Sequence, residues 1–398
     1  MPRRLSLALA FLLSMAVAAQ AGDDLPLCGT IPTSYVLARE TYPKLKDAID
    51  LVGKQPVATW WTDNNPTYIS DVQTLLDTCS KNSLPVIVVY GLPQRDCGAG
   101  FSNLGKINST EAYLEFIKDL VGRVGSRPVL YIMEPDAIGA AADGTGCAAT
   151  NGYLDNMQAA VPLLTANENA RLYFDVGFWM LNSAGDATKI SKAVHYVGSK
   201  SREGAVKGIV LNTSNLRQTA EMLAKCSLFV EAASVNTTYK CAIDTSRNYR
   251  TPNTTTEWCN NKYAALGVPP TSQTGHSDLL DYFLWVKVPG ESDGECNTTQ
   301  QSADAMVGPR AGKFFEKAFS MQWDRGYFVD KKLGKPLREY DLGSDFTLPS
   351  SGLSGGAIAA IVISCLIVAA GAAYFVRRRV YPKQKTVLVE ASTPQVLA

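Results

Sequence analysis

Acidic and other polar residues recur just after short apolar runs along the middle of the chain. They are Asp63, Tyr90, Arg95, Asp96, Glu134, Asp136, Asp175, Asn212, Asp244, Arg247, Lys287, Glu291 and Asp293. Two carboxyl groups can cleave the bond between two sugars when one donates a proton to the departing oxygen and the other activates water. The chain therefore carries the residue types for glycosidic bond cleavage, provided that the fold gathers them in one place.

Other chemistries have less support in the sequence. Only two histidines are present, which disfavours hydrolysis by a Ser-His-Asp triad. No pair of cysteines has CxxC spacing, so we expect no zinc site, no other metal and no cofactor. Indole rings can stack on pyranose rings, and five tryptophans are candidates, with core packing as the alternative for each: Trp60, Trp61, Trp179, Trp258 and Trp285. Because Trp60 and Trp61 are adjacent in an expected strand, at most one of them faces the interior of a barrel.

Seven short apolar runs between these residues have the composition of buried strands. The expected strands are Val57–Trp61, Val86–Tyr90, Val129–Met133, Leu172–Asp175, Val206–Leu211, Cys241–Ile243 and Phe283–Val286. Several are apolar throughout, as in a parallel sheet covered by helices on both faces. Residues 69–79 and 113–124 have the apolar spacing of helices, the second following candidate caps at Ser109 and Thr110.

Alternation of strands and helices leaves an open doubly wound sheet or a (β/α) barrel as the main α/β architectures. An open nucleotide-binding sheet would show a glycine-rich turn after an early strand, and neither GxGxxG nor a P-loop occurs. Polar residues follow nearly every expected strand instead, and the carboxyl ends of barrel strands meet at one mouth. The sequence therefore favours a barrel, with residues 22–344 as one domain.

The two ends of the chain resemble targeting segments. Residues 1–21 begin with two arginines, continue with an apolar run and end in Ala-Gln-Ala, which predicts a cleaved signal peptide rather than an uncleaved anchor. Residues 356–376 are 21 uncharged residues, enough to span a bilayer. Residues 345–355 would be a short stalk, and the three arginines that begin the tail, residues 377–398, place that tail in the cytoplasm. We expect a single-pass type I protein with its ectodomain at the cell surface.

The composition between these ends fits an exported protein. It has 31 basic and 36 acidic residues, a net charge of about −5, which is the wrong sign for nucleic-acid binding. Of the nine cysteines, Cys365 lies in the expected membrane span, and the remaining eight are an even number that suits disulfides, although spacing alone does not give their pairing. Glycosylation sequons occur at Asn108, Asn212, Asn236, Asn253 and Asn297.

Several segments together resemble glycoside hydrolase family 6, the inverting cellulases. In chain order they are VVYGLPQRDCGAGFSN (Val88–Asn103), MEPD (Met133–Asp136), LYFDVG (Leu172–Gly177), LNTSN (Leu211–Asn215), DTSRN (Asp244–Asn248), EWC (Glu257–Cys259) and LWVKVPGESDG (Leu284–Gly294). The resemblance covers about residues 55–320 and implies a distorted barrel of about seven parallel strands that cleaves β-1,4-glucan with inversion.

The resemblance also implies roles for individual residues. Asp136 would be the proton donor, and Asp96 would keep it protonated and help to hold a chain of waters. Tyr90 would press on a distorted sugar, Ser102 would hold the nucleophilic water, and Asp293 falls on the family's disputed candidate for the base. Further contacts to the substrate would come from Trp61, Arg95, Asp175, Asn212, Trp258, Lys287 and Glu291. Cys97 and Cys147 match a family disulfide, Cys259 with Cys296 resembles a shifted one, and Cys28–Cys79 and Cys226–Cys241 remain by elimination.

Two residues have simpler alternatives, and the chain departs from the family pattern in places. Asp136 could be a helix N-cap, and Arg95 with Asp96 could be a local salt bridge. Phe178 and Trp179 replace the residues expected after Gly177, which puts acceptor-side stacking in doubt. A short loop after Asp293 favours an open cleft and internal cutting over a tunnel. We expect a monomer; the alternatives are an inactive wall-glucan-binding protein or a hydrolase of another polysaccharide.

Overall fold

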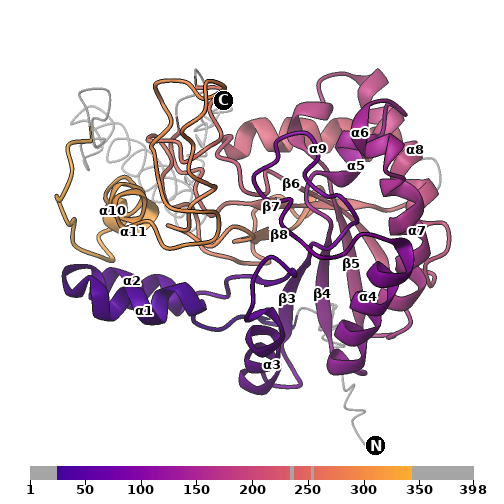
Figure 1. Ribbon diagram of the computed structural model, residues 1–398, viewed down its shortest axis with the longest axis horizontal. Helices are drawn as coiled ribbons and strands as arrows, with labels where there is room; N and C mark the ends of the chain where they lie inside the picture. Colours follow the sequence, from indigo (N-terminus) through magenta and orange to yellow (C-terminus); the bar gives the residue numbers. More distant parts are fainter. Residues whose placement is uncertain (1–24, 234–236, 252–254, 343–398) are drawn as a thin grey trace, which may run out of the picture. The chain divides into compact units, whose positions relative to one another are not determined.

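The computed structural model describes residues 25–233, 237–251 and 255–342, which form a parallel sheet wrapped by helices (Figure 1). Seven strands pair in chain order, all in parallel: β2 (Thr59–Trp61), β3 (Leu84–Val89), β4 (Val129–Met133), β5 (Ala170–Asp175), β6 (Val206–Leu211), β7 (Lys240–Asp244) and β8 (Leu280–Leu284). A two-residue strand, β1 (Leu27–Cys28), pairs with the start of β3. The seven predicted parallel strands are confirmed, and the last of them begins three residues earlier and ends two residues earlier than predicted.

The sheet curls into a half-barrel whose edge strands β2 and β8 meet without a ladder. A single parallel bridge joins Val57 to Trp285, and the backbone N–H of Ala58 donates to the carbonyl of Trp285 at 2.9 Å. Inside the curl, alternate strand residues pack into an apolar core that includes Val88, Ile132 and Tyr173. The barrel is therefore distorted, as predicted, with the irregularity at the β2–β8 seam.

Helices cover the outer face of the curled sheet and form the larger core with it. They are α3 (Tyr68–Thr78), α4 (Thr110–Val124), α7 (Tyr153–Leu164), α8 (Ala184–Gly198) and α9 (Thr219–Ala233). Helix α4 begins where the hydroxyl of Ser109 accepts a hydrogen bond from the N–H of Ala112, and it ends at Gly125, whose φ of 61° suits glycine. The predicted cap at Ser109 is confirmed. The short helices α5 (Ala137–Ala141) and α6 (Gly146–Thr150) and the turn η2 (Phe178–Met180) lie in loops after β4 and β5.

The first and last described helices pack together beside the sheet (Figure 1). The indigo helices are α1 (Thr33–Thr41) and α2 (Lys46–Gly53), joined by η1 (Pro43–Leu45), and the orange ones are α10 (Glu316–Asp324) and α11 (Tyr327–Asp330). The rings of Tyr35 and Phe319 are 6.0 Å apart, and the Tyr35 hydroxyl donates to the carbonyl of Pro289 at 2.7 Å. This second core therefore supports the loop that follows β8.

Four disulfides join the eight cysteines of the predicted ectodomain: Cys28–Cys79, Cys97–Cys147, Cys226–Cys241 and Cys259–Cys296. The pairings implied by the family resemblance and those left by elimination are both confirmed. Two of the bridges tie loops that follow the strands. Cys97 follows Asp96 directly, and Cys296 lies three residues after Asp293. Closing such loops removes conformational freedom from the unfolded chain and so stabilises the folded one.

Several sequence predictions lie outside the described residues. They are the signal peptide at 1–21, the stalk at 345–355, the span at 356–376, the tail at 377–398, and the sequons at Asn236 and Asn253. Within the described part of the chain, none of the helices has the length and apolar character needed to cross a membrane. The sequons at Asn108 and Asn297 are exposed, as glycosylation requires.

Candidate active site

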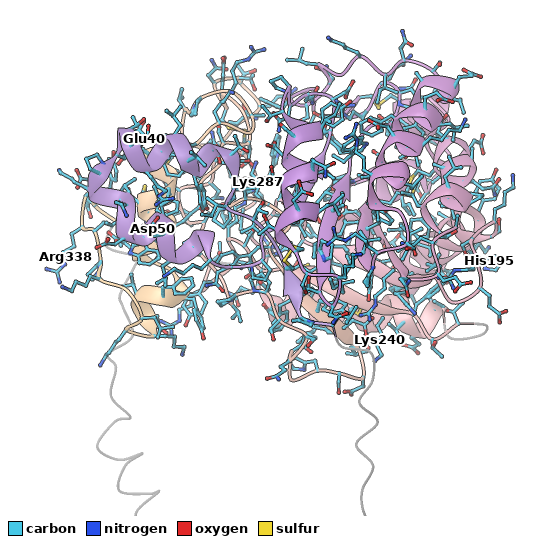
Figure 2. All side chains as sticks on the ribbon, turned by 90° about the horizontal axis from the view of Figure 1, so that it is seen from below. Glu40, Asp50, His195, Lys240, Lys287 and Arg338 are labelled. Carbon is cyan, nitrogen blue, oxygen red and sulfur yellow. A yellow bond between two sulfur atoms is a disulfide. The ribbon has the colours of Figure 1, made fainter. Side chains whose placement is uncertain are left out.

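The predicted functional residues follow the carboxyl ends of the parallel strands and therefore lie on one edge of the sheet. Tyr90, Glu134 and Asn212 come directly after β3, β4 and β6, while Asp175 and Asp244 are the last residues of β5 and β7. Lys287 follows β8 and is almost completely buried, between the α1–α2 pair and the sheet (Figure 2). His195, by contrast, is exposed on α8 at the far side of the helical layer (Figure 2).

Asp136 is the carboxyl group best suited to hold a proton. It precedes α5, but within the described residues its side chain makes no capping hydrogen bond, so the N-cap alternative fails. Its backbone is left-handed, with φ 69°, and its side chain is partly exposed. Desolvation by burial, and then the charges of Asp175 and Asp96, raise the pKa of Asp136 well above its ordinary value. A protonated carboxyl that solvent can reach is what a general acid requires.

Asp175 is the closest electrostatic partner of Asp136. One of its carboxylate oxygens accepts a hydrogen bond of 2.7 Å from the N–H of Asp136, and the other accepts one from the hydroxyl of Thr213. Its side chain is buried, which raises its pKa to about 7 despite these two bonds. The charge of Asp175 therefore raises the pKa of Asp136, while the buried side chain of Asp175 is not accessible to a substrate. Thr213 was not predicted; the only sequence signal for it is its position just after Asn212.

Asp96 and Ser102 belong to the loop that follows β3. One oxygen of Asp96 accepts a hydrogen bond of 2.5 Å from the N–H of Ser102, and the carbonyl of Ser102 accepts one of 2.6 Å from the side-chain amide of Asn64. Burial raises the pKa of Asp96, and N–H groups of residues 99–102 oppose that rise. The charge of Asp96 is also one of the two that raise the pKa of Asp136. The structure thus brings Asp96 and Asp136 together.

Tyr90 is held between an indole ring and a guanidinium group. Its ring meets the Trp60 ring edge to face at 5.6 Å, and the guanidinium carbon of Arg95 lies 5.1 Å from the centre of the Tyr90 ring. The backbone N–H of Tyr90 donates to the carbonyl of Trp61 at 3.0 Å. Two neighbours and a backbone bond therefore set the orientation of Tyr90 at the end of β3.

The prediction that Trp61 is a stacking platform is wrong. Trp61 is 0% exposed and donates from its indole N–H to the carbonyl of Phe116 at 3.1 Å. In the register of β2 and β3, Trp60 pairs with Val88, which faces the interior, whereas Trp61 pairs with Val89, which faces the helices. Only one of the two adjacent tryptophans faces the interior, as predicted, and it is Trp60.

Arg95 does not face a substrate either. Its guanidinium is 3% exposed and lies 2.6 Å from an oxygen of Asp63. The other oxygen of Asp63 accepts bonds from the N–H groups of Lys106 and Ile107. A salt bridge was the alternative for Arg95, and it is present, with Asp63 rather than Asp96 as the partner. This buried pair fastens both ends of the loop that carries Asp96 and Ser102.

Asp293 is poorly suited to act as a base. One oxygen lies 2.7 Å from the Arg247 guanidinium and accepts the N–H of Asn260, and the other lies 3.2 Å from the Lys287 ammonium. Although burial opposes them, Arg247 and Lys287 lower the pKa of Asp293. A carboxylate with a lowered pKa and two cationic partners takes up a proton weakly. This environment disfavours the expected base role. The charge of Lys287 is paired inside the protein, where Lys287 also donates to the carbonyl of Ser292.

Asn212 is a structural residue of the loop after β6. Its amide donates to the carbonyls of Arg217 and Asp244 at 3.1 and 2.9 Å, and its oxygen accepts the N–H of Arg217 at 3.0 Å. It is 1% exposed, so the prediction that it faces a sugar is wrong. A buried amide with three hydrogen bonds also leaves no room for a glycan at this sequon.

Three predicted binding side chains remain open to solvent near these groups. Trp258 is 36% exposed and meets Phe101 of the Ser102 loop edge to face at 5.3 Å, and Trp179 is 41% exposed. Glu291 is partly exposed, and burial raises its pKa while the charge of Lys287 lowers it. Trp285 is completely buried. Two aromatic faces and one carboxyl are thus available to a sugar chain.

The comparisons with known proteins agree on one family. A model described as glycosyl hydrolases family 6 matches residues 33–324. Endoglucanase A of Thermobispora bispora is 30% identical over 266 residues, which cover 65% of this chain and 55% of that protein. Endoglucanase 1 of Streptomyces sp. (strain KSM-9) is 33% identical over 258 residues, 61% of this chain and 65% of that one. The chain thus spans less than two thirds of the length of either relative.

A solved structure shows the same arrangement of strands and helices. The endoglucanase Cel6 of Mycobacterium tuberculosis, in complex with methyl-cellobiosyl-4-deoxy-4-thio-beta-D-cellobioside, superposes with a TM-score of 0.60 at 28% identity. The match covers 74% of this chain and 95% of that one. The similarity therefore extends over nearly the whole of a folded catalytic protein.

Proposed function

The chain belongs to glycosyl hydrolases family 6, and from that premise we propose that it hydrolyses β-1,4-glucosidic bonds of cellulose or a related β-glucan with inversion at the anomeric carbon. One observation carries the proposal. Asp136 is a partly exposed carboxyl whose pKa is raised by burial and by two neighbouring acids, and no capping bond occupies it in the described structure. These properties support Asp136 as the acid that gives a proton to a bound sugar.

In this mechanism Asp136 protonates the glycosidic oxygen as its bond to the anomeric carbon breaks. A water on the opposite face of the sugar attacks that carbon, which inverts its configuration, and the attacking water gives up a proton to the waters beside it. Ser102 and Asp96 lie on one loop and share a hydrogen bond, so they are suited to hold this water and accept its proton through a chain of waters. Tyr90, held by Trp60 and Arg95, presses on the sugar at the cleavage point.

Binding of the glucan depends on the exposed aromatic residues. Trp258 supplies a stacking face on one side of the cleavage point, and Trp179 supplies one on the other, where Phe178 is packed near Arg217 and Lys225. Glu291 binds sugar hydroxyl groups. The short loop after Asp293 favours an open cleft and cutting within the chain.

The stereochemistry of the first product tests this proposal. NMR of a soluble cello-oligosaccharide digest, recorded before mutarotation, should show the α-anomer first, and Asp136→Asn should form almost none. A β-anomer at the start would remove the inverting assignment. If glucan binds but no new reducing ends are released, the chain is a binding protein instead. If only another polysaccharide is cleaved, the proposed substrate, β-1,4-glucan, is wrong.

We propose further that the enzyme is monomeric and works at the cell surface, held by a single membrane span. A cleaved signal at residues 1–21, an apolar stretch at 356–376 and the basic residues that follow it support this location. An enzyme that cannot diffuse away would act on the wall of its own cell. Deletion of residues 356–376 should release active enzyme into the medium, and an unchanged membrane fraction would show that another segment anchors it.

A further inference from the structure

Glu134 is a completely buried carboxylate directly behind the candidate active site. It follows β4, is 0% exposed, and has a left-handed backbone with φ 51°. Its oxygens accept hydrogen bonds from the N–H of Gly91 at 2.9 and 3.2 Å, from the N–H of Leu92 at 3.3 Å and from the hydroxyl of Tyr113 at 2.9 Å. Every one of these partners is a donor.

The two backbone donors belong to the segment that carries Tyr90 and Asp96. Gly91 follows Tyr90, and the same segment continues to Asp96. Gly91 also rests on the ring of Phe116, since a Cβ at this position would lie 2.4 Å from that ring. The segment is therefore pinned between an apolar ring on one side and the Glu134 carboxylate on the other.

The backbone of Glu134 belongs instead to the strand end that carries Asp136. Its N–H donates to the carbonyl of Val89 at 2.9 Å, and its own carbonyl accepts the N–H of Ala137 at 3.0 Å. Glu134 and Asp136 are both left-handed, as are Gln94 and Asp96 in the neighbouring segment. Such backbone persists only where the surroundings hold it in place. Glu134 thus joins the two strained segments that present the candidate acid and its partner.

The hydrogen-bond pattern explains why this position needs oxygen acceptors. Burial raises the pKa of Glu134 to about 7, while the hydrogen bonds and the charge of Arg95 act against that rise. An uncharged glutamine has the same shape, but its NH2 group would face N–H donors and lose their bonds. Removal of an acceptor from buried donors is costly because the donors then have no partner.

On this evidence we propose that Glu134 is a positioning residue, which holds Tyr90 and Asp96 at a fixed distance from Asp136 by binding the Gly91–Leu92 backbone. The predicted effect of Glu134 on catalysis rests on the proposed function, whereas its hold on the Gly91–Leu92 backbone does not. The hydrogen bonds themselves are open to a test that needs no substrate.

The test uses the full-length protein with Glu134→Gln and Tyr113→Phe, and with Glu115→Gln as the control. Glu115 lies on the same helix as Tyr113, and its side chain is 71% exposed. Kinetics on carboxymethyl cellulose should show a kcat about 100-fold lower for Glu134→Gln, with KM changed by less than about twofold, because misplaced catalytic groups affect the chemical step. Hydrogen–deuterium exchange should rise in peptides spanning residues 90–105 and stay unchanged in those of β6. Tyr113→Phe should show smaller changes in the same directions, and the control none.

Two outcomes would overturn the proposal. One is unchanged exchange over residues 90–105 in variants that fold, and the other is a KM that rises while kcat stays constant. If Glu134→Gln does not fold, Tyr113→Phe decides, since it removes the hydroxyl that orients the Glu134 carboxyl group and so loosens the hold on the Gly91–Leu92 backbone. If wild type cleaves no glucan, the proposed function fails, and exchange over residues 90–105 still supports or refutes the positioning role.

Discussion

The backbone N–H of Asp136 donates a 2.7 Å hydrogen bond to the carboxylate of Asp175, so two acids from neighbouring strand ends are held side by side. No residue shown to contact either carboxylate in the described structure is a cation. Like charges in a buried place resist ionising together, and one of the two therefore keeps its proton. Asp136, the more accessible of the two, is the proposed acid, and this arrangement leads to several of the expectations below.

Replacement of Asp136 by asparagine should abolish most of the activity. The side chain keeps its shape but loses the proton that it would donate, so kcat should fall by about 10²–10⁴-fold. Initial rates of reducing-end release measure this, with Asp143→Asn as a control because Asp143 is exposed and pairs with Lys189 at the surface. An Asp136→Asn enzyme within about tenfold of wild type would show that the donor is elsewhere.

Replacement of Asp175 by asparagine should move the alkaline limb of the pH profile. The charge of Asp175 is the largest neighbouring charge that raises the pKa of Asp136, and asparagine removes it while an oxygen remains for the Asp136 N–H. The pKa of Asp136 should fall, so the loss of kcat/KM at high pH should begin about one unit lower. Asp50→Asn, far from the site on α2, should leave the profile unchanged.

The stability of the fold should fall between about pH 4 and about pH 7. Burial raises the pKa values of Asp175 and Glu134 to about 7, so the folded chain holds protons there that the unfolded chain releases at lower pH. These two groups stabilise the fold below their unfolded pKa values, and that contribution is lost as the pH rises through about 7. Thermal unfolding at several pH values measures it. Asp175→Asn should make the unfolding temperature depend less steeply on pH between about pH 4 and about pH 7. An equally steep dependence in this variant would show that Asp175 does not have the raised pKa.

Replacement of Asp293 by asparagine should destabilise the protein. The buried charges of Arg247 and Lys287 lose their partner, at a cost of about 3–5 kcal/mol in the free energy of unfolding. Urea unfolding followed by tryptophan fluorescence gives this value. Sodium azide should not restore activity to Asp293→Ala; rescue by azide would instead identify Asp293 as the base.

Two tryptophans should respond in opposite ways to substitution. Trp258→Ala should raise KM for cello-oligosaccharides about tenfold with little effect on stability, because an exposed stacking face is lost. Trp61→Ala should instead cost about 3–5 kcal/mol of stability, because it empties part of the core. Binding isotherms and chemical unfolding of both variants distinguish the two roles. A stable Trp61→Ala with a raised KM would place that ring against the substrate.

Much of the fold and part of the candidate site could be predicted from the sequence. The apolar runs predicted the seven parallel strands, and Ser109 predicted the start of α4. The family segments predicted two of the four disulfides, and elimination gave the other two. These features depend on local pattern, since burial and capping leave signs in the sequence itself. Asp96 and Asp136 were likewise placed together, because both follow neighbouring parallel strands.

The remaining assignments needed the packed structure. Five residues at or after strand ends use their oxygens to bind neighbouring loops or buried cations: Asp63, Asp175, Asn212, Asp244 and Asp293. Which of Trp60 and Trp61 faces inward depends on the register with β3. Sequence by itself therefore determined the parallel strands, two cysteine pairs through family resemblance and two by elimination, and the set of acids at one edge. Only the tertiary structure showed which acid is suited to keep its proton and remain accessible, because a pKa and a free hydrogen-bonding position depend on the neighbours that a side chain meets in space.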